Sequence, residues 1–240
     1  MQELKLAIFD VAGTVIEDHG EVVSSFVDAL AAHGIGVGSE ELMEFKGAAK
    51  REVIRFMGWR KRNEPLSEPA VEAVYTDFER LVNERYEEQL APIAGAEETF
   101  ESLRKRGMQM ALTTGFGQAT LDLVVRRLGW EEWFAAKISS DEVKMGRPAP
   151  YLIFRAMEAA GCWRVRGVAT VGDTALDLQA GDHAGVRWNI GVLSGAHDRR
   201  TLERAPHTHL LGGVAEVAAL WGLSPEPEAP PPAAVSLPPG

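Results

Sequence analysis

Residues 6–14 read LAIFDVAGT, an apolar run that ends in an aspartate followed by a glycine turn. Leu4 and the first four residues of the run are the nearly unbroken apolar stretch expected of a strand buried on both faces of a sheet. Gly13 ends the stretch soon after Asp10. Asp10 is therefore expected at the carboxyl end of a parallel strand, where open α/β sheets bind their ligands. We interpret it as a catalytic nucleophile, with a solvated turn aspartate as the alternative.

Three later segments carry polar residues of the same kind, and they read MQMALTTG (108–115), GRPAP (146–150) and VATVGDTALD (168–177). The first and the third are apolar runs that end in hydroxyl or carboxyl side chains, as further buried strands would. The second holds a single basic residue, Arg147, in a turn that its prolines stiffen.

In this order, the strand-end aspartate, the strand-end threonine, the lone cation and the GDxxxD pair resemble the four motifs of the haloacid dehalogenase (HAD) superfamily. The resemblance covers residues 5–220. It implies an α/β fold with a doubly wound parallel sheet and an inserted helical cap domain. It also implies hydrolysis through an aspartyl-phosphate on Asp10.

Phosphoryl transfer needs a nucleophile in line with phosphorus, a divalent cation, and positive charge or hydrogen-bond donors for the phosphoryl oxygens. Hard oxygen ligands suit Mg²⁺, and we expect them from Asp10, Asp173, Asp177 and the backbone carbonyl of Ala12. Asp177 follows Asp173 by about one helical turn, so it can share the ion or orient its waters.

For the phosphoryl oxygens, Thr114 offers a hydroxyl group and Arg147 a guanidinium group. Thr113 could take the hydroxyl role instead, but the residue directly before the glycine fits the HAD position better. The remaining contacts to substrate are expected from the turns at the two strand ends and the mouth of the pocket, namely Ala12, Gly13, Thr14, Gly115 and Phe116.

Two departures from the commonest HAD pattern narrow the interpretation. Most HAD phosphatases carry a second aspartate two residues after the nucleophile, as a general acid, and this chain has Ala12 there. Such an acid contributes roughly 100- to 10,000-fold in rate. Arg147 stands where most members have lysine. Both features are typical of the phosphonoacetaldehyde hydrolase (phosphonatase)-like group, which the chain resembles.

Members of that group cleave a carbon–phosphorus bond with a cap lysine that forms a Schiff base with the substrate aldehyde. The resemblance assigns this role to Lys50 in KGAAKREVI, residues 46–54. The nearby charges of Lys46, Arg51 and Arg55 would lower its pKa if burial assists. A solvated surface lysine is the alternative. The match is incomplete, because Val53, Lys46 and Gly20 replace a histidine, a methionine and a cysteine of the group.

The leading hypothesis is thus a magnesium-dependent hydrolase of a small phosphonate or phosphorylated metabolite. A phosphatase of small phosphate esters or pyrophosphate, or a mutase similar to β-phosphoglucomutase, is the enzymatic alternative. Both normally use the acid that Ala12 replaces. A phosphometabolite-binding protein without catalysis is the third hypothesis, against which the retention of all four motifs speaks.

The 240 residues fit one α/β domain with an insertion. We expect the core domain over 1–16 and 96–222, the helical cap over 17–95 and a disordered proline-rich tail over 223–240. A net charge of −10 argues against nucleic acid as a partner. The single cysteine and the lack of a signal peptide or membrane span predict a cytoplasmic enzyme, and the resemblance allows a homodimer.

Helical periodicity fills the cap region without a strand, and we expect helices from 22 onward, over 40–57 and over 69–89. From residue 97, helices alternate with strands, which predicts a parallel sheet with right-handed crossovers. The expected strands after the first are 108–113, 136–139, 167–171 and 186–191. His207 and His209 are expected in a surface loop.

Overall fold

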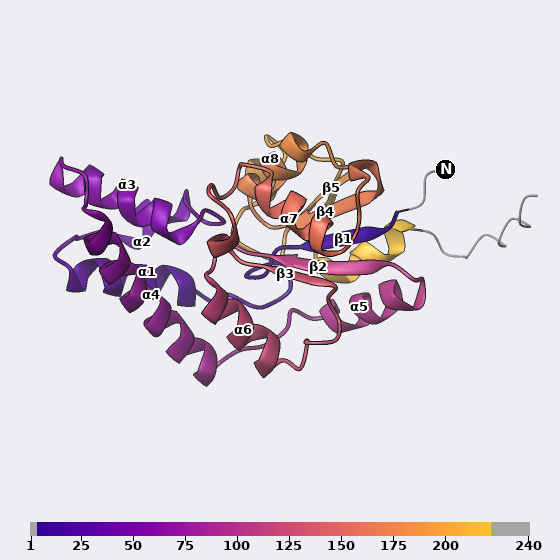
Figure 1. Cartoon of the computed structure of the whole chain (residues 1–240), viewed down its shortest axis with the longest axis horizontal. Helices are drawn as coiled ribbons and strands as arrows, with labels where there is room; N and C mark the ends of the chain where they lie inside the picture. The colour runs from indigo at the N-terminus through magenta and orange to yellow at the C-terminus, as the bar shows by residue number, and fades with distance from the viewer. Residues whose placement is uncertain (1–3, 222–240) are drawn as a thin grey trace, which may run out of the picture.

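The structure is a computed structural model that describes residues 4–221, and its central feature is one parallel sheet (Figure 1). The strand order is β3-β2-β1-β4-β5-β6, which confirms the doubly wound α/β fold expected from the sequence. The strands are β1 (Leu6–Phe9), β2 (Gln109–Thr113), β3 (Ala136–Ile138), β4 (Val168–Gly172), β5 (Trp188–Val192) and β6 (His209–Leu211). Phe9 pairs with Leu112 of β2 and Val171 of β4, so the three strands end side by side.

Helices cover both faces of the sheet because successive side chains of a strand point to opposite faces. Ala7 and Phe9 of β1 pack with α5 (Ala96–Lys105) and α6 (Gln118–Arg127). Leu6 and Ile8 pack on the other face, in a cluster that includes residues of α7 (Tyr151–Ala159) and α8 (Ala175–Ala184). Both faces of β1 are therefore buried, as its unbroken apolar sequence requires. Shorter elements complete this part: η1 (Ser140–Glu142), η2 (Val165–Gly167), α9 (Arg199–Leu202) and η3 (Val214–Trp221).

Five helices separate β1 from β2 in the chain, and the first four lie together beyond one end of the sheet (Figure 1). They are α1 (Glu21–Ala32), α2 (Ser39–Met43), α3 (Lys50–Arg62) and α4 (Glu68–Glu88), and we refer to residues 21–88 as the helical insert. Phe26 of α1 stacks on Phe78 of α4 with ring centroids 4.3 Å apart. The exact boundaries of the cap domain, 17 and 95, stay a prediction.

Two expectations about elements are wrong. The helix expected over 40–57 is interrupted, because α2 ends at Met43, a turn follows and α3 begins at Lys50. Residues 209–211 form β6 instead of a surface loop, since they pair with β5, and His209 stacks on Trp188 with centroids 4.9 Å apart. The expected tail, 223–240, lies outside the described residues. Among residues 4–221, no helix combines the length and the apolar character needed to cross a membrane.

Candidate active site

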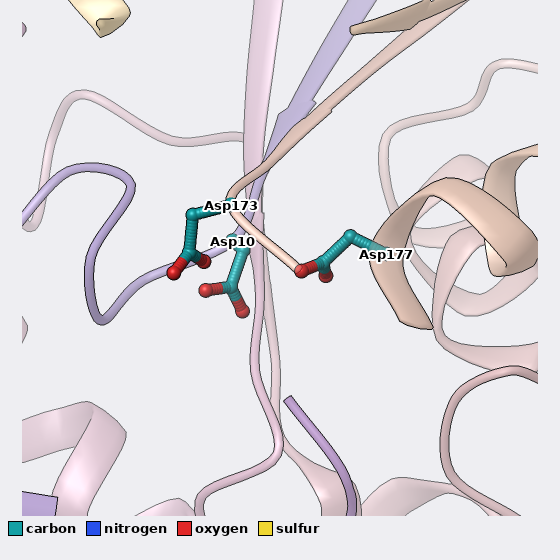
Figure 2. A group of neighbouring side chains, drawn as sticks. All are labelled: Asp10, Asp173 and Asp177. Atoms are coloured by element: carbon teal, nitrogen blue, oxygen red, sulfur yellow. The ribbon is translucent and has the colours of Figure 1, made fainter. Parts of the chain in front are cut away.

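Asp10 lies directly after β1 and is almost completely buried. Its backbone N–H donates a hydrogen bond to the carbonyl oxygen of Val171, which fixes it against the end of β4. Figure 2 shows its carboxylate beside that of Asp173, with Asp177 extending toward both from the start of α8. One oxygen from each of the three side chains lies within 4.8 Å of the others. The structure thus brings together all three predicted metal-binding carboxylates.

Asp173 is held by two loops. Thr14 Oγ1 donates to Asp173 Oδ1 at 3.2 Å, and the backbone N–H of Ala196 donates to Oδ2 at 2.6 Å. Gly13 has a φ of 81°, and a Cβ at this position would lie 2.5 Å from Asp173 Oδ2. Only glycine therefore permits this turn so close to the carboxylate. Gly13 and Thr14 thus support Asp173, and their predicted contact with substrate stays a prediction.

Asp177 is positioned by the N-terminal cap of α8. Its backbone N–H donates to Thr174 Oγ1 at 3.2 Å, and its Oδ2 accepts from the backbone N–H of Thr174 at 3.1 Å. This reciprocal pair is a capping box. It leaves Asp177 Oδ1 facing the interior of the site, where Arg147 lies 2.6 Å away.

Arg147 contacts the nucleophile candidate itself. Its Nη1 lies 2.6 Å from Asp10 Oδ1, and its Nη2 donates to the carbonyl oxygen and to Oγ1 of Thr113 at 2.9 Å each. All of these groups are buried. The guanidinium therefore orients one oxygen of Asp10 and leaves Oδ2 free of it. In this structure Nη1 and Nη2 contact protein groups, and the predicted contact of Arg147 with the phosphoryl oxygens stays a prediction.

The same contacts separate the two threonines. The hydroxyl of Thr113 accepts from Arg147 and borders a small cavity of about 10 Å³ beside Asp177. The hydroxyl of Thr114 accepts from the backbone N–H of Phe116 at 3.1 Å and borders the cavity above Asp10. Its own proton remains available to a ligand there. This geometry favours Thr114 for the hydroxyl role.

Burial changes the protonation of the carboxylates. Desolvation raises the pKa of Asp10 to about 6, against the opposing effect of Arg147. Desolvation and the neighbouring Asp10 and Asp177 raise the pKa of Asp173 to about 8. Three buried carboxylates beside one guanidinium carry more negative charge than the protein neutralises. The donor set is all oxygen, so the residues fit a hard divalent cation such as Mg²⁺.

Lys50 is the first residue of α3 and is only 6% exposed. It borders the same cavity as Asp10 and Thr114, with its Nζ 4.9 Å from the ring centroid of Phe116. Nζ donates one long hydrogen bond, 3.3 Å, to the carbonyl oxygen of Ala48. The amine thus has a single weak partner of its own and faces the nucleophile candidate across the cavity.

Burial lowers the pKa of Lys50 to about 8, with Asp10 opposing the shift and Arg147 adding to it. The predicted direction and the part of burial are confirmed, but Lys46, Arg51 and Arg55 are not among the causes of the shift. The three cap cations are neutralised by acidic partners: Lys46 by Asp18, Arg51 by Glu72 and Asp141, and Arg55 by Glu68. Desolvation is therefore the main cause of the lowered pKa of Lys50, rather than the charges of these three cations.

The cavity is small and has a largely apolar wall on the side of the insert. Its volume is about 40 Å³, which is space for only a few water molecules. Of the predicted site residues, those that border it are Asp10, Ala12, Lys50, Thr114, Gly115, Phe116 and Asp173. The wall contributed by α1, α2, the turn after α2 and α3 contains Val22, Val23, Phe26, Leu42, Phe45 and Val53. Gly13, Thr14, Arg147 and Asp177 lie behind this lining.

The sequence interpretation missed an ion pair at the same cavity. Asp18 Oδ2 lies 3.2 Å from Lys46 Nζ, and both side chains are largely buried. Burial alone would raise the pKa of Asp18, but Lys46 and the N–H groups of Gly20 and Val22 outweigh it and lower the pKa. The neighbouring His19 is exposed and pairs with Glu17. In the sequence, this ion pair is indicated only by the position of Asp18, an acidic residue between the nucleophile candidate and α1.

Comparison with known proteins places these features in one family. Residues 4–185 match the family model described as haloacid dehalogenase-like hydrolase. A bifunctional phosphonoacetaldehyde hydrolase/aminoethylphosphonate transaminase from Clostridioides difficile is 30% identical over 82% of the chain, although the match spans only 32% of that longer protein. A phosphonoacetaldehyde hydrolase from Bacillus thuringiensis is 27% identical over 82% of the chain and 78% of its own length.

The fold has close counterparts among solved structures. The crystal structure of a phosphonoacetaldehyde hydrolase-like protein from Oleispira antarctica aligns with a TM-score of 0.80 and 22% identity. The alignment covers 91% of each chain. Identity this low supports the shared fold and leaves the chemistry to the residues of the site.

Proposed function

Because the chain belongs to the haloacid dehalogenase-like hydrolases, and is therefore an enzyme, we propose that it cleaves a small phosphonate by the reaction that the names of its relatives describe. The substrate would carry an aldehyde beside its carbon–phosphorus bond, as phosphonoacetaldehyde does. One observation carries the proposal: a buried amine, Lys50, shares a cavity with the carboxylate of Asp10. Imine formation requires an unprotonated primary amine, and burial favours that form.

In this proposal Lys50 Nζ adds to the aldehyde carbon, and loss of water gives an iminium. The pKa of Lys50, lowered to about 8, leaves a fraction of the amine unprotonated and nucleophilic near neutral pH. Asp10 Oδ2 then attacks phosphorus while the carbon–phosphorus bond breaks and its electrons move into the iminium to give an enamine. Protonation and hydrolysis of the enamine release acetaldehyde, and water cleaves the aspartyl-phosphate to regenerate Asp10.

Several groups would stabilise the phosphoryl group during this transfer. Mg²⁺ bound by Asp10, Asp173 and Asp177 would neutralise negative charge on the phosphoryl oxygens. Thr114 can donate its hydroxyl proton to one of these oxygens, and Arg147 keeps Asp10 in the attacking orientation. Ala12 borders the cavity where HAD phosphatases place their general acid. An enamine leaving group needs no proton on oxygen, so this proposal accounts for the alanine.

A phosphatase of small phosphate esters or pyrophosphate is the second candidate, and Val53 favours it. Val53 borders the cavity at the position where the phosphonatase-like group carries a histidine. Without that histidine, Lys50 could bind an anionic substrate by charge alone. The same argument extends to a mutase similar to β-phosphoglucomutase. Both alternatives would lack the usual acid.

Borohydride trapping tests the proposal directly. Added together with phosphonoacetaldehyde, it should inactivate the enzyme irreversibly and leave a mass adduct on the peptide that contains Lys50. Lys50→Arg keeps the charge and cannot form the imine, so it should lose almost all activity toward the aldehyde. Lys144→Arg is the matched control, because Lys144 is exposed on the core and borders a different cavity. Retained activity toward the aldehyde in Lys50→Arg, with no adduct in the wild type, would refute the imine. Absence of both the adduct and phosphonoacetaldehyde turnover in the wild type would favour the phosphatase instead.

The proposed partner is accordingly a small phosphonylated or phosphorylated metabolite. The homodimer stays a prediction, as does the absence of nucleic acid among its partners. Sedimentation of the purified chain would test the first, and a filter-binding assay with duplex DNA the second.

A further inference from the structure

We propose that Arg51 and Glu52 are positioning residues, which fasten the first turn of α3 to the core and so hold Lys50 and Arg147 in place around Asp10. Both side chains lie outside the catalytic cavity but border another one, of about 430 Å³, between the insert and the core. The effect on turnover rests on the function proposed above. The fastening itself rests only on contacts.

Arg51 forms the first contact. Its Nη1 lies 2.6 Å from Asp141 Oδ1, across the boundary between the insert and the core element η1. Its guanidinium is held from behind, because Nε donates to Glu72 Oε1 at 2.7 Å and the group lies 3.6 Å from the ring centroid of Tyr75. A guanidinium fixed on two sides loses little further freedom when it pairs with Asp141.

Asp141 also contacts the loop that borders the catalytic cavity. Its Oδ2 accepts from the backbone N–H of Gln118 at 2.8 Å, at the start of α6. Gln118 closely follows Thr114 and Phe116, which border the cavity. One carboxylate therefore joins α3 to the loop that follows β2.

Glu52 forms the second contact. Its Oε1 accepts from the backbone N–H of Gly146 at 3.1 Å. The next residue is Arg147, whose guanidinium orients Asp10. A Cβ at Gly146 would lie only 2.6 Å from the Cβ of Ala49, so the backbones of the two segments approach closely here. The turn before Arg147 is thus seated directly on the start of α3.

The three consecutive side chains diverge, because successive residues of a helix point about 100° apart. Lys50 enters the catalytic cavity, Arg51 reaches η1, and Glu52 reaches the turn before Arg147. If this helical turn rotated so as to withdraw Lys50, the contacts of Arg51 with Asp141 and of Glu52 with Gly146 would both break.

Hydrogen exchange tests the fastening without any substrate. In the full chain, Glu52→Ala should raise the exchange rate of the Gly146 amide and of the peptide covering residues 50–56 by about tenfold, which corresponds to about 1.4 kcal/mol. Glu52→Gln keeps an acceptor oxygen and should restore near wild-type rates. Asp141→Asn, which keeps the acceptor for Gln118, should raise exchange at residues 50–56 severalfold. Unchanged exchange in Glu52→Ala and Asp141→Asn would overturn the proposal.

Glu68→Ala is the matched control. Glu68 pairs with Arg55, one helical turn after Arg51, in a contact that stays within the insert. In Glu68→Ala, the hydrogen-exchange rate of the Gly146 amide should equal that of the wild type. An equal rise there would show that any loss of charge near α3 loosens the segment, and would overturn the specific roles of Arg51 and Glu52.

Kinetics then separate a positioning role from a structural one. With phosphonoacetaldehyde as the probe, Glu52→Ala should lower kcat about tenfold with a smaller change in KM, and Glu52→Gln should rescue kcat. Faster exchange with unchanged kcat and kcat/KM would overturn the positioning role. A wild type that releases no phosphate from phosphonoacetaldehyde would refute the proposed function instead, and p-nitrophenyl phosphate would then replace it as the probe in the same comparison.

Discussion

At the scale of the residue, the site is a balance of buried charges around Asp10. Burying a carboxylate is costly unless it is paired, and here two of the three carboxylates, Asp10 and Asp177, share the guanidinium of Arg147. Burial raises the pKa values of Asp10 and Asp173, and the neighbouring carboxylates add to the rise. A divalent cation would oppose this rise. The lowered pKa of Lys50 has the same origin, because desolvation penalises a buried charge of either sign.

The first prediction concerns the nucleophile. Asp10→Asn should lower kcat by at least about a thousandfold, since an amide oxygen is a poor nucleophile and the covalent step is lost. The fold should survive, because asparagine fills the same space and can still accept a hydrogen bond from Arg147. Phosphate release measures the first effect, and circular dichroism with thermal unfolding measures the second. Activity within tenfold of the wild type would end the assignment.

The second prediction concerns pH and magnesium. The folded pKa values of Asp10 and Asp173, about 6 and about 8, lie above their ordinary value of 3.8. The metal-free folded state therefore holds protons that the unfolded state has released, and its stability falls as pH rises from about 4 to about 8. Mg²⁺ binds the carboxylate form, so it should raise Tm more above pH 8 than below pH 6. Scanning calorimetry with and without a chelator measures both effects.

Asp173→Asn isolates the group responsible. This variant should lose most of the fall in stability between pH 6 and pH 8 and most of the rise in Tm that Mg²⁺ produces, since the charged ligand is gone. If its Tm still rises with Mg²⁺ as in the wild type, Asp173 does not bind the ion.

At the scale of the element, a helix or strand is predicted best where a local sequence pattern determines it. An unbroken apolar run followed by a polar residue and a glycine identified β1 and the position of Asp10. The helix over 40–57 was wrong because the apolar spacing continues through the turn between α2 and α3, where Gly47 approaches Thr174 and Ala48 approaches Gly115 of the core. β6 was missed because a strand of three residues carries little periodicity of its own, and its pairing with β5 decides it.

The contacts within the site were less predictable than its members. Which groups meet Arg147 depends on residues up to 137 positions away in the chain, so no spacing rule reveals that it clamps Asp10. The sequence favoured Thr114 over Thr113 by its place before the glycine, and the structure supports that choice because Thr114 borders the cavity with Asp10 whereas Thr113 borders the one beside Asp177. The burial of Lys50 likewise depends on how the insert sits on the core.

The third prediction concerns the cap of α8. Thr174→Ala removes the hydroxyl that accepts from the backbone N–H of Asp177, and it should lower the free energy of unfolding by about 1 kcal/mol. Because the same cap positions Asp177, affinity for Mg²⁺ should fall as well. Urea unfolding and magnesium titration measure the two effects, and Thr174→Ser should restore both.

Ser67→Ala is the control for this prediction. Ser67 caps α4 in the same way, by accepting from the backbone N–H of Ala70, but it lies in the insert away from the carboxylates. It should cost a similar amount of stability and leave magnesium affinity unchanged. Equal loss of magnesium affinity in both variants would show that α8 has no specific role at the metal site.

At the scale of the whole molecule, the insert and the sheet share one hydrophobic cluster. Tyr86, at the end of α4, packs edge to face on Phe116 of the core at a centroid distance of 6.0 Å. Phe9 of β1 packs on Phe100 of α5 at 5.5 Å within the same cluster. The catalytic cavity lies where the two parts meet, since Asp10 and Thr114 come from the core and Lys50 from the insert. The packing that stabilises the insert therefore also closes the site.

The last prediction follows from this continuity. If one cluster joins both parts, the insert and the sheet should unfold in a single cooperative transition. Phe78 is buried in the insert and stacks on Phe26, so Phe78→Ala should lower the free energy of unfolding by about 3–5 kcal/mol. That loss should affect β4 in the core as much as α4 in the insert. Pulsed hydrogen exchange in urea, read on peptides from α4 and from β4, measures the two transitions separately. Coincident midpoints in the wild type that shift together in Phe78→Ala are expected, whereas a shift confined to α4 would show that the insert is a separate folding unit.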